Sequence, residues 1–417
     1  MRTHPGILTI VRLLAALAFA ACGGLAAAQP APPSPMVDES HSAQWVFAFK
    51  FNAADFPTTA SVTTCLFGGT PQTYKSSQRY VFAYDSAPAL QDGPGLIGVS
   101  TADPVGATFA KIYASGVNFV VWNDQFYRHP PIGGCSDSCG GPWGHSKGVI
   151  AWDDLGQGVV LQVTTPSWPG SGTAAAPRDS DGNTLGCVGD DDVKASQHFF
   201  ALRLTPTDTA AVLDALLNAS VVTDVSNPQL ARIGGPSSLQ QRALALGKKS
   251  KSKVALDVTL SSGVRLISKP SALHVPPWQM ISALLGAPLR AATWWTNPKI
   301  PTTTAATPIA CWDNSLGTPG AVVIATSGQW QNHALGLTGG PQLDANHAKI
   351  GVSTDPRHPY VIFADMNQQG QLAGNCASSQ NGRGGLFFIV SDPALHASVE
   401  QLIDGSVSDH GVERGSH

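Results

Sequence analysis

Residues 144–149, GHSKGV, have a counterpart in the second half of the chain at residues 346–351, NHAKIG. In each copy a His-x-Lys motif leads directly into apolar residues that are typical of a strand. Side chains alternate between the two faces of a strand, so the imidazole and the ammonium group of each copy point the same way. A motif that occurs twice predicts a duplicated chain of the α/β (α+β) class, in which each half is built around its own sheet.

The repetition continues downstream of both motifs. Residues 199–202, FFAL, have the composition of a buried strand and precede a predicted helix, as do residues 387–390, FFIV. The apolar face of each helix recurs at helical spacing: Val212, Leu213, Leu216 and Leu217 in the first, and Leu395, Val399, Leu402 and Ile403 in the second. We therefore predict two halves, residues 41–222 and 254–412, joined by a linker at residues 223–253.

The two motifs supply the groups that phosphate transfer without a metal requires. One His can attack phosphorus and form a covalent intermediate, while the other protonates the leaving oxygen and then activates water. Two lysines can stabilise the negative charge that gathers on the phosphate oxygens. The expected catalytic residues are His145, Lys147, His347 and Lys349, with no metal and no cofactor.

Other polar residues follow each motif at similar distances. An Asp lies eight residues after each His, at Asp153 and Asp355, where it either supports the site or caps a turn. Ser167 lies 22 residues after the first His, and Asn367 lies 20 after the second. Asp365 either orients a catalytic His or bonds to the backbone at the end of a strand.

The first 28 residues have the pattern of an export signal. A basic start is followed by an apolar run, residues 7–21, and by three alanines, residues 26–28, that suit cleavage. The run is too short for a membrane span. Cys22 weakly suggests a lipoprotein instead. Residues 29–40 then form a Pro-rich leader, and the predicted location is secreted or periplasmic.

Removal of that signal leaves six cysteines in an exported chain, which favours disulfide bonds. Six cysteines allow fifteen pairings, and the sequence does not choose among them. A zinc site at Cys135 and Cys139 is the alternative. It is the weaker one, because the compartment is oxidising and no second close pair of cysteines accompanies it.

The charge of the chain favours a polyanion only in acid. Loss of two arginines with the signal leaves 23 basic and 28 acidic residues, a net charge of −5 with neutral histidines. Protonation of the eleven remaining histidines, which titrate near pH ~6.5, would bring the net charge to +6. DNA binding is therefore expected to improve as the pH falls.

Several other segments have two interpretations. The lysine-rich residues 248–253 fit a solvated linker better than a contact with a DNA backbone. Residues 172–192 predict an irregular acidic loop without the ligand spacing of a calcium site. Residues 123–125 predict a structural turn near the site, and Trp294 and Trp295 are expected in the core.

Six segments, taken in order along the chain, resemble the deoxyribonuclease II family. They are residues 45–50 (WVFAFK), 120–125 (VVWNDQ), 144–149 (GHSKGV), 346–349 (NHAK), 364–367 (ADMN) and 383–385 (RGG). They span most of the chain that follows the signal.

The resemblance implies a phospholipase D-like fold, with two pseudo-symmetric halves that each hold a mixed sheet flanked by helices and that share one active site. It implies metal-independent endonucleolytic cleavage of DNA in acid, through a phospho-histidine, with 3′-phosphate ends. His145 as nucleophile and His347 as general acid follow from the wider fold. Asn367 matches the family's Asn and is the fifth expected catalytic residue, whereas Ser167 is a shorter donor in the corresponding place.

Two other functions remain open on the sequence. One is another phosphodiesterase on the same fold, such as a phospholipase, and the other is a non-catalytic exported protein that binds DNA. The deoxyribonuclease-like segments weigh against the first, and the two histidines weigh against the second, since a binder needs only cations. DNA is the expected partner. No protein partner is predicted, and a homodimer is possible.

Overall fold

The computed structural model describes residue 1 and residues 31–58, 64–71, 76–112, 117–126, 132, 134–135, 138–169, 184–188 and 192–409. The described residues are mixed α+β and mostly β, with five α-helices. The strands form two large sheets and one small hairpin. This agrees with the expected fold class.

The first sheet holds the first His-x-Lys motif near its middle. It has eight strands in the order β3-β2-β1-β7-β6-β5-β4-β8, and each neighbouring pair is antiparallel. The expectation of a mixed sheet is therefore wrong for this half. The strands are β1 (Trp45–Lys50), β2 (Tyr80–Tyr84), β3 (Ala87–Asp92), β4 (Asn118–Asn123), β5 (Lys147–Trp152), β6 (Gly158–Val163), β7 (Gln197–Leu204) and β8 (Ala231–Arg232).

The second sheet has seven strands in the order β12-β11-β15-β16-β17-β10-β9. It is mixed, because β11 and β12 run parallel while its other neighbours are antiparallel. Its strands are β9 (Leu256–Thr259), β10 (Arg265–Lys269), β11 (Leu289–Ala292), β12 (Val322–Ile324), β15 (Ile350–Ser353), β16 (Tyr360–Ala364) and β17 (Gly385–Ser391). The separate hairpin is β13 (Ser327–Trp330) with β14 (His333–Gly336).

Both motifs open a β-hairpin that local sequence specifies well. β5 and β6 are almost wholly apolar and buried, which suits strands that are covered on both faces. Asp153 accepts hydrogen bonds from the backbone N–H groups of Leu155 and Gln157 and so caps the turn between them. Asp355 accepts from the N–H of Arg357 in the turn after β15. The turn-capping interpretation of both aspartates is confirmed.

The two sheets meet face to face in the centre of the fold. Phe363 of the second sheet stacks on Phe47 and Phe200 of the first, with ring centroids 4.4 and 4.5 Å apart. Two helices fill the rest of this layer, α2 (Pro206–Ala219) and α5 (Pro393–Leu402), and both bury apolar faces there. Thr205 and Asp208 form a capping box that starts α2.

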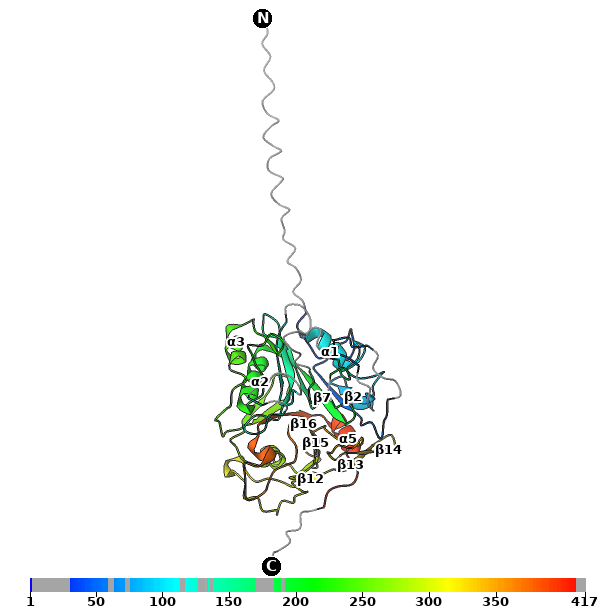
Figure 1. Cartoon of the computed structure of the whole chain (residues 1–417), viewed down its shortest axis with the longest axis vertical. Helices are drawn as coiled ribbons and strands as arrows, with labels where there is room; N and C mark the ends of the chain where they lie inside the picture. Colours follow the sequence, from blue (N-terminus) through cyan, green and yellow to red (C-terminus); the bar gives the residue numbers. More distant parts are fainter. Residues whose placement is uncertain are drawn as a thin grey trace, which may run out of the picture. The chain divides into compact units, whose positions relative to one another are not determined.

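The outer faces of the sheets are covered as well. Phe109 of α1 (Pro104–Ile112) packs with Phe199 on the outside of the first sheet. In Figure 1, α1 and α2 accordingly lie on opposite sides of β7. Trp278 of α4 (Pro277–Leu285) packs edge-on against Phe387 outside the second sheet. Each sheet is therefore covered by apolar side chains on both faces. Polar side chains can gather at the ends of its strands.

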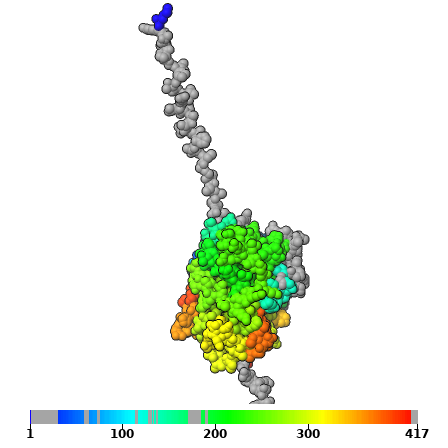
Figure 2. Space-filling view, turned by 90° about the vertical axis from the view of Figure 1, so that its left-hand side faces the viewer, coloured from blue at the N-terminus to red at the C-terminus, as the bar shows by residue number. Residues whose placement is uncertain are grey.

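Residues 223–253, the expected linker, form part of the folded first half. They contain β8, which pairs with β4, and α3 (Ser237–Leu244), which lies beside α2 (Figure 1). Lys249 of the basic run lies 5.0 Å above the ring of Trp143. On the face seen in Figure 2, green residues of the first half adjoin yellow and orange residues of the second. The two sheets therefore belong to one continuous body.

Several expectations concern the start of the chain and its cysteines. Apart from Met1, the predicted export signal lies outside the described residues, as does most of the acidic segment 172–192. Part of the Pro-rich leader is packed, since Met36 is buried and its N–H donates to Thr108. The disulfide bonds are Cys65–Cys187, Cys135–Cys139 and Cys311–Cys376, so Cys135 and Cys139 are not zinc ligands.

None of the helices in the described part of the chain is both long and apolar enough to cross a bilayer.

Candidate active site

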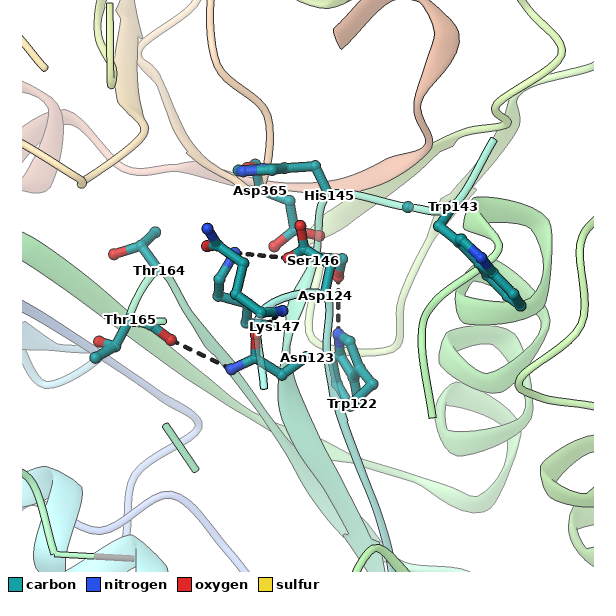
Figure 3. Close-up of polar contacts among 12 residues, drawn as sticks. Trp122, Asn123, Asp124, Trp143, His145, Ser146, Lys147, Thr164, Thr165 and Asp365 are labelled. Atoms are coloured by element: carbon teal, nitrogen blue, oxygen red, sulfur yellow. Dashed lines mark hydrogen bonds and ion pairs between the residues drawn. The ribbon is translucent and has the colours of Figure 1, made fainter. Parts of the chain in front are cut away.

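The first motif lies at the start of β5 and is held by the second half of the chain. The backbone N–H of His145 donates to the carbonyl of Gly384 over 2.8 Å. Its ring Nδ1 lies 2.7 Å from the backbone carbonyl of Asp365. Figure 3 shows the His145 ring next to Asp365. A carbonyl only accepts hydrogen bonds, so Nδ1 carries the proton and Nε2 keeps its lone pair.

The second motif is held by the first half in the same manner. Asn346 forms a bridge with Ser196, the residue before β7, and the N–H of His347 donates to the Ser196 carbonyl over 2.7 Å. Lys349 directly precedes β15, and its ammonium contacts the His347 carbonyl. In each half, the residue that precedes the long strand accepts a hydrogen bond from the His of the other half. These residues are Ser196 before β7 and Gly384 before β17.

Both histidines open onto one cavity of about 850 Å³. His145, His347, Lys349 and Asn367 line it, and so does Arg383. Four of the five expected catalytic side chains are therefore brought together from segments far apart in the sequence. Among the described residues, the remaining expected ones, Lys147, Asp365 and Ser167, lie behind the cavity wall.

Lys147 is fixed by a buried carboxylate that the sequence marked only as part of a turn. Asp124 follows β4 and lies 2.6 Å from the Lys147 ammonium through one oxygen. Its other oxygen lies 2.7 Å from the guanidinium of Arg383, which also donates to the Gly144 carbonyl. One carboxylate thus orders two cations, one from each half.

His347 has two different partners at Nδ1. The carboxylate of Asp192 lies 3.1 Å away, and the side-chain amide nitrogen of Gln197 lies 3.3 Å away. The protonated ring can donate to Asp192, and the neutral ring can accept from Gln197. Trp294 packs edge-on against this ring, with centroids 4.0 Å apart. Trp294 lines the cavity instead of lying in the core as expected, whereas Trp295 packs against the core.

A chain of hydrogen bonds links the two motifs behind the cavity. The backbone N–H of Lys349 donates to Nδ1 of the buried His198, and Nε2 of His198 faces the Gln162 carbonyl oxygen at 3.4 Å. The amide of Gln162 donates to the Asp365 carboxylate, and the Asp365 backbone carbonyl accepts from His145. Asp365 therefore does both things that the sequence left open: its carboxylate binds backbone and amide donors, while its carbonyl orients His145.

Asn367 faces the cavity and Ser167 does not. The amide nitrogen of Asn367 donates to Gln369, and its oxygen has no hydrogen-bond partner among the described residues. Ser167 is buried and its hydroxyl lies 3.3 Å from the Gln125 carbonyl. Strand register explains the difference. The first hairpin is one residue longer, so Pro166 occupies the place that corresponds to Asn367.

Burial and the clustered cations lower the pKa values of the bases. Burial is the main cause that holds the pKa of both histidines well below 6.5, because a buried imidazolium loses its hydration. Lys147 lowers the pKa of His145 further, and Lys349 that of His347. The pKa of Lys349 is also lowered well below 10.5 by burial and by Lys147. Burial raises the pKa of Asp365 to about 7.

Several residues of this site were not assigned a role from the sequence: Asp124, Gln162, Asp192, His198, Trp294 and Arg383. Two of them, Asp124 and Arg383, lie in segments that carry the family resemblance, and this resemblance could have identified them as site residues. Nothing in local spacing distinguishes His198 or Asp192 from surface residues. In the described ranges, no three His, Cys, Asp or Glu side chains gather as metal ligands would.

Comparison with known proteins gives a family to which this geometry can be related. The family model for deoxyribonuclease II matches residues 68–407, which include both motifs, Asp124 and Arg383. No curated protein sequence matches the chain. Since the match covers most of the chain and both halves of the cavity, the chain belongs to the deoxyribonuclease II family and is a deoxyribonuclease.

Proposed function

We propose that this deoxyribonuclease cleaves DNA endonucleolytically at acid pH, without a divalent metal, and leaves 3′-phosphate ends through a phospho-histidine intermediate. The observation that carries the proposal is the meeting of His145 and His347 at one cavity with Lys349, Arg383 and Asn367. These are the groups that phosphoryl transfer needs: two bases, compact cations and a neutral donor.

The different surroundings of the two histidines support different roles. His145 has a carbonyl at Nδ1, which leaves the Nε2 lone pair available for attack on phosphorus. His347 has the Asp192 carboxylate at Nδ1, which can accept the Nδ1–H both when the ring is charged and after Nε2 has given up its proton. A group that gives a proton in one step and takes one in the next requires both forms. We therefore assign His145 as the nucleophile and His347 as the general acid and base.

The proposed reaction has two steps. In the first, Nε2 of His145 forms a bond to phosphorus, the bond to the 5′ oxygen breaks, and that oxygen takes a proton from His347. In the second, His347 takes a proton from water, the hydroxide attacks phosphorus, and the bond to His145 breaks. The products are a 5′-hydroxyl and a 3′-phosphate, and both histidines return to their initial states.

The cavity cations stabilise the phosphate during both steps. Lys349 and Arg383 line the cavity and can bind its non-bridging oxygens, while Lys147, held by Asp124, adds positive charge from behind. The amide of Asn367 is a neutral donor in the same wall. An entering phosphodiester is anionic, so it also offsets the repulsion that lowers the pKa of the histidines.

A phospholipase D-like arrangement of two pseudo-symmetric halves is part of the proposal. Its support is the matching chain connectivity of five neighbouring strands, β1-β7-β6-β5-β4 in the first sheet and β10-β17-β16-β15-β11 in the second, although the strands that flank these five are connected differently in the two sheets. In both, the strand after the His-x-Lys motif lies third from the same end. Export by the N-terminal signal stays a prediction, as does the possibility of a homodimer.

Cleavage is expected to persist without free metal. Purified chain incubated with supercoiled plasmid at pH ~5 in excess chelator should still give nicked and linear products, because the cations at the cavity are side chains. A lipid headgroup-release assay under the same conditions tests the phospholipase alternative. Activity that disappears with chelator and returns with magnesium contradicts the mechanism, and DNA retention without cleavage favours a pure binding protein.

The pH profile is expected to be a bell centred below pH ~6.5. His145 must be neutral to attack and His347 protonated to donate a proton. Both pKa values are lowered, so loss of the His347 proton already begins in the acid range and ends activity at neutral pH. The measurement is kcat/KM on an oligonucleotide from pH ~3 to ~8 at constant ionic strength. A rate that keeps rising through pH ~7 contradicts the proposed protonation states.

A further inference from the structure

Two lysines outside the cavity are completely buried, which is rare for this residue type. Lys50 is the last residue of β1, Lys269 is the last residue of β10, and both side chains are 0% exposed. They occupy matching places, since Lys50 pairs with Gln197, the first residue of β7, and Lys269 pairs with Gly385, the first residue of β17.

Each buried ammonium binds a cluster of backbone carbonyls. The Lys50 ammonium lies 2.7 Å from the Val193 carbonyl, 2.5 Å from that of Ala195, and 2.9 Å from those of Phe51 and Ser77. The Lys269 ammonium lies 2.8 Å from the Asn381 carbonyl, 2.9 Å from that of Arg383 and 3.4 Å from that of Pro270. A buried ammonium group is costly unless hydrogen-bond acceptors surround it. The contacts with the carbonyls therefore fix the backbone of residues 193–195 and of residues 381–383.

The loops that the lysines bind are the ones that hold the two histidines. Residues 193–195 lie between Asp192, which faces His347 Nδ1, and Ser196, whose carbonyl accepts the His347 N–H. In the second half of the chain, residues 381–383 directly precede Gly384, whose carbonyl accepts a hydrogen bond from the His145 N–H. Arg383 itself pairs with Asp124, the partner of Lys147.

We propose that Lys50 and Lys269 are positioning residues of the active site, with Lys50 setting the place of His347 and Lys269 setting that of His145. The assignment crosses between the halves, because each lysine belongs to the half opposite to its histidine. Burial lowers the pKa of Lys269 to about 7, so an acidic medium keeps the Lys269 ammonium group charged.

The test uses Lys50→Met and Lys269→Met, which keep the length of the side chain and remove its donors. Rates are measured on a DNA oligonucleotide and on thymidine 3′-(4-nitrophenyl phosphate), whose leaving group needs no proton. This part rests on the proposed function, in which His347 protonates the leaving oxygen. A misplacement of about 1 Å can lower kcat by about 10²-fold. We expect Lys50→Met to lose that much on DNA and much less in the first-turnover release of 4-nitrophenolate from the activated ester, because only the later hydrolysis of the intermediate needs His347 there, and Lys269→Met to lose it in both measurements.

His145→Ala and His347→Ala supply the reference pattern. If the histidine roles are reversed, the patterns of both histidine variants exchange, and Lys50→Met still follows His347→Ala while Lys269→Met still follows His145→Ala. A failure of the role assignment is therefore distinct from a failure of this inference. Leu395→Ala, in the central core on α5, is the control. It lowers the stability of the fold and leaves both buried lysines in place. Lysine variants with full kcat, or with losses no larger than those of this control, overturn the positioning role.

A second measurement does not depend on turnover. In NMR spectra of chain with 13C-labelled histidine rings, Lys50→Met should change the pKa and ring tautomer of His347 and leave His145 unchanged. Lys269→Met should do the opposite. Lys50→Gln and Lys269→Gln retain an amide donor and should lie between the wild type and the Met variants. Ring signals that are unchanged, or failure of both Met and Gln variants to fold, would assign these lysines to general stability and reject the proposal.

Discussion

Replacement of either His145 or His347 by Ala is expected to lower kcat on plasmid DNA by about 10⁴-fold or more. Each residue belongs to a different half, yet both line the same cavity, so loss of either removes one of the two groups that every turnover needs. The double variant should be little worse than either single variant, because groups that act as one unit are not additive. His358→Ala changes an exposed histidine that is absent from this cavity wall and serves as the matched control.

Chemical trapping distinguishes the two histidines. Rapid quenching of a reaction with DNA that carries 32P in its internal phosphates, followed by peptide mapping in alkali, should place the phosphoryl label on the peptide that contains His145. The label should accumulate in His347→Ala when an activated ester is the substrate, since formation of the intermediate then needs no acid while its hydrolysis still needs a base. Label on His347 reverses the assignment, and substantial activity in either single variant rejects the shared site.

Asp124→Asn is expected to destabilise the fold by about 3 to 5 kcal/mol and to lower activity as well. Asp124 is 1% exposed and binds Lys147 and Arg383, so the neutral amide leaves two buried cations without their counter-charge. Arg383 lines the cavity, and Lys147 lies directly behind its wall. The free energy of unfolding is measured in denaturant at pH ~5 and ~7, with kcat/KM measured beside it.

The pH dependence of this contribution follows from the Asp124 pKa. Burial would raise that pKa, but Lys147 and Arg383 outweigh burial and hold it far below the usual value. Since a free Asp titrates near pH ~3.9, the stabilisation is complete above that pH and is lost as the pH falls towards the folded pKa. The ion cluster therefore stays charged at pH ~5, where cleavage is expected.

A surface ion pair provides the control for this experiment. Asp404 pairs with Arg290 but its side chain is 64% exposed, so Asp404→Asn should change stability by no more than about 1 kcal/mol. If Asp124→Asn keeps wild-type stability and kcat, the ion cluster of Asp124, Lys147 and Arg383 neither stabilises the fold nor takes part in phosphate binding.

Local patterns in the sequence were sufficient for the elements around both motifs. The apolar residues that follow the first His-x-Lys motif predicted β5, and helical periodicity after residues 199–202 and 387–390 predicted α2 and α5. These features depend on neighbours within a few positions, which is why they are readable from the chain alone. The same reasoning failed for residues 223–253, where low hydrophobicity suggested a linker although α3 and β8 are present. Their stability comes from packing on α2 and pairing with β4.

Lys50 shows the limit of local reasoning most clearly. A lysine at the end of a strand normally reaches solvent, and nothing in residues 45–50 indicates otherwise. Its burial depends on the carbonyls of residues 193 and 195, which lie 143 and 145 positions away. The same holds for Trp294, whose aromatic composition suggested core but whose ring lies against His347.

The sequence by itself determined that this chain carries two His-x-Lys motifs that lead into apolar strands, and the resemblance of its segments determined the family. Only the tertiary structure decided which atoms complete the site. The Asp365 carbonyl that orients His145 is 220 positions away, and the Arg383 that shares Asp124 is 259 positions from it. Strand patterns are set by side chains near in sequence, whereas protonation and orientation are set by dipoles and charges near in space. That is why the two histidines proposed as catalytic can be identified from the sequence, whereas their different surroundings arise only in the folded chain.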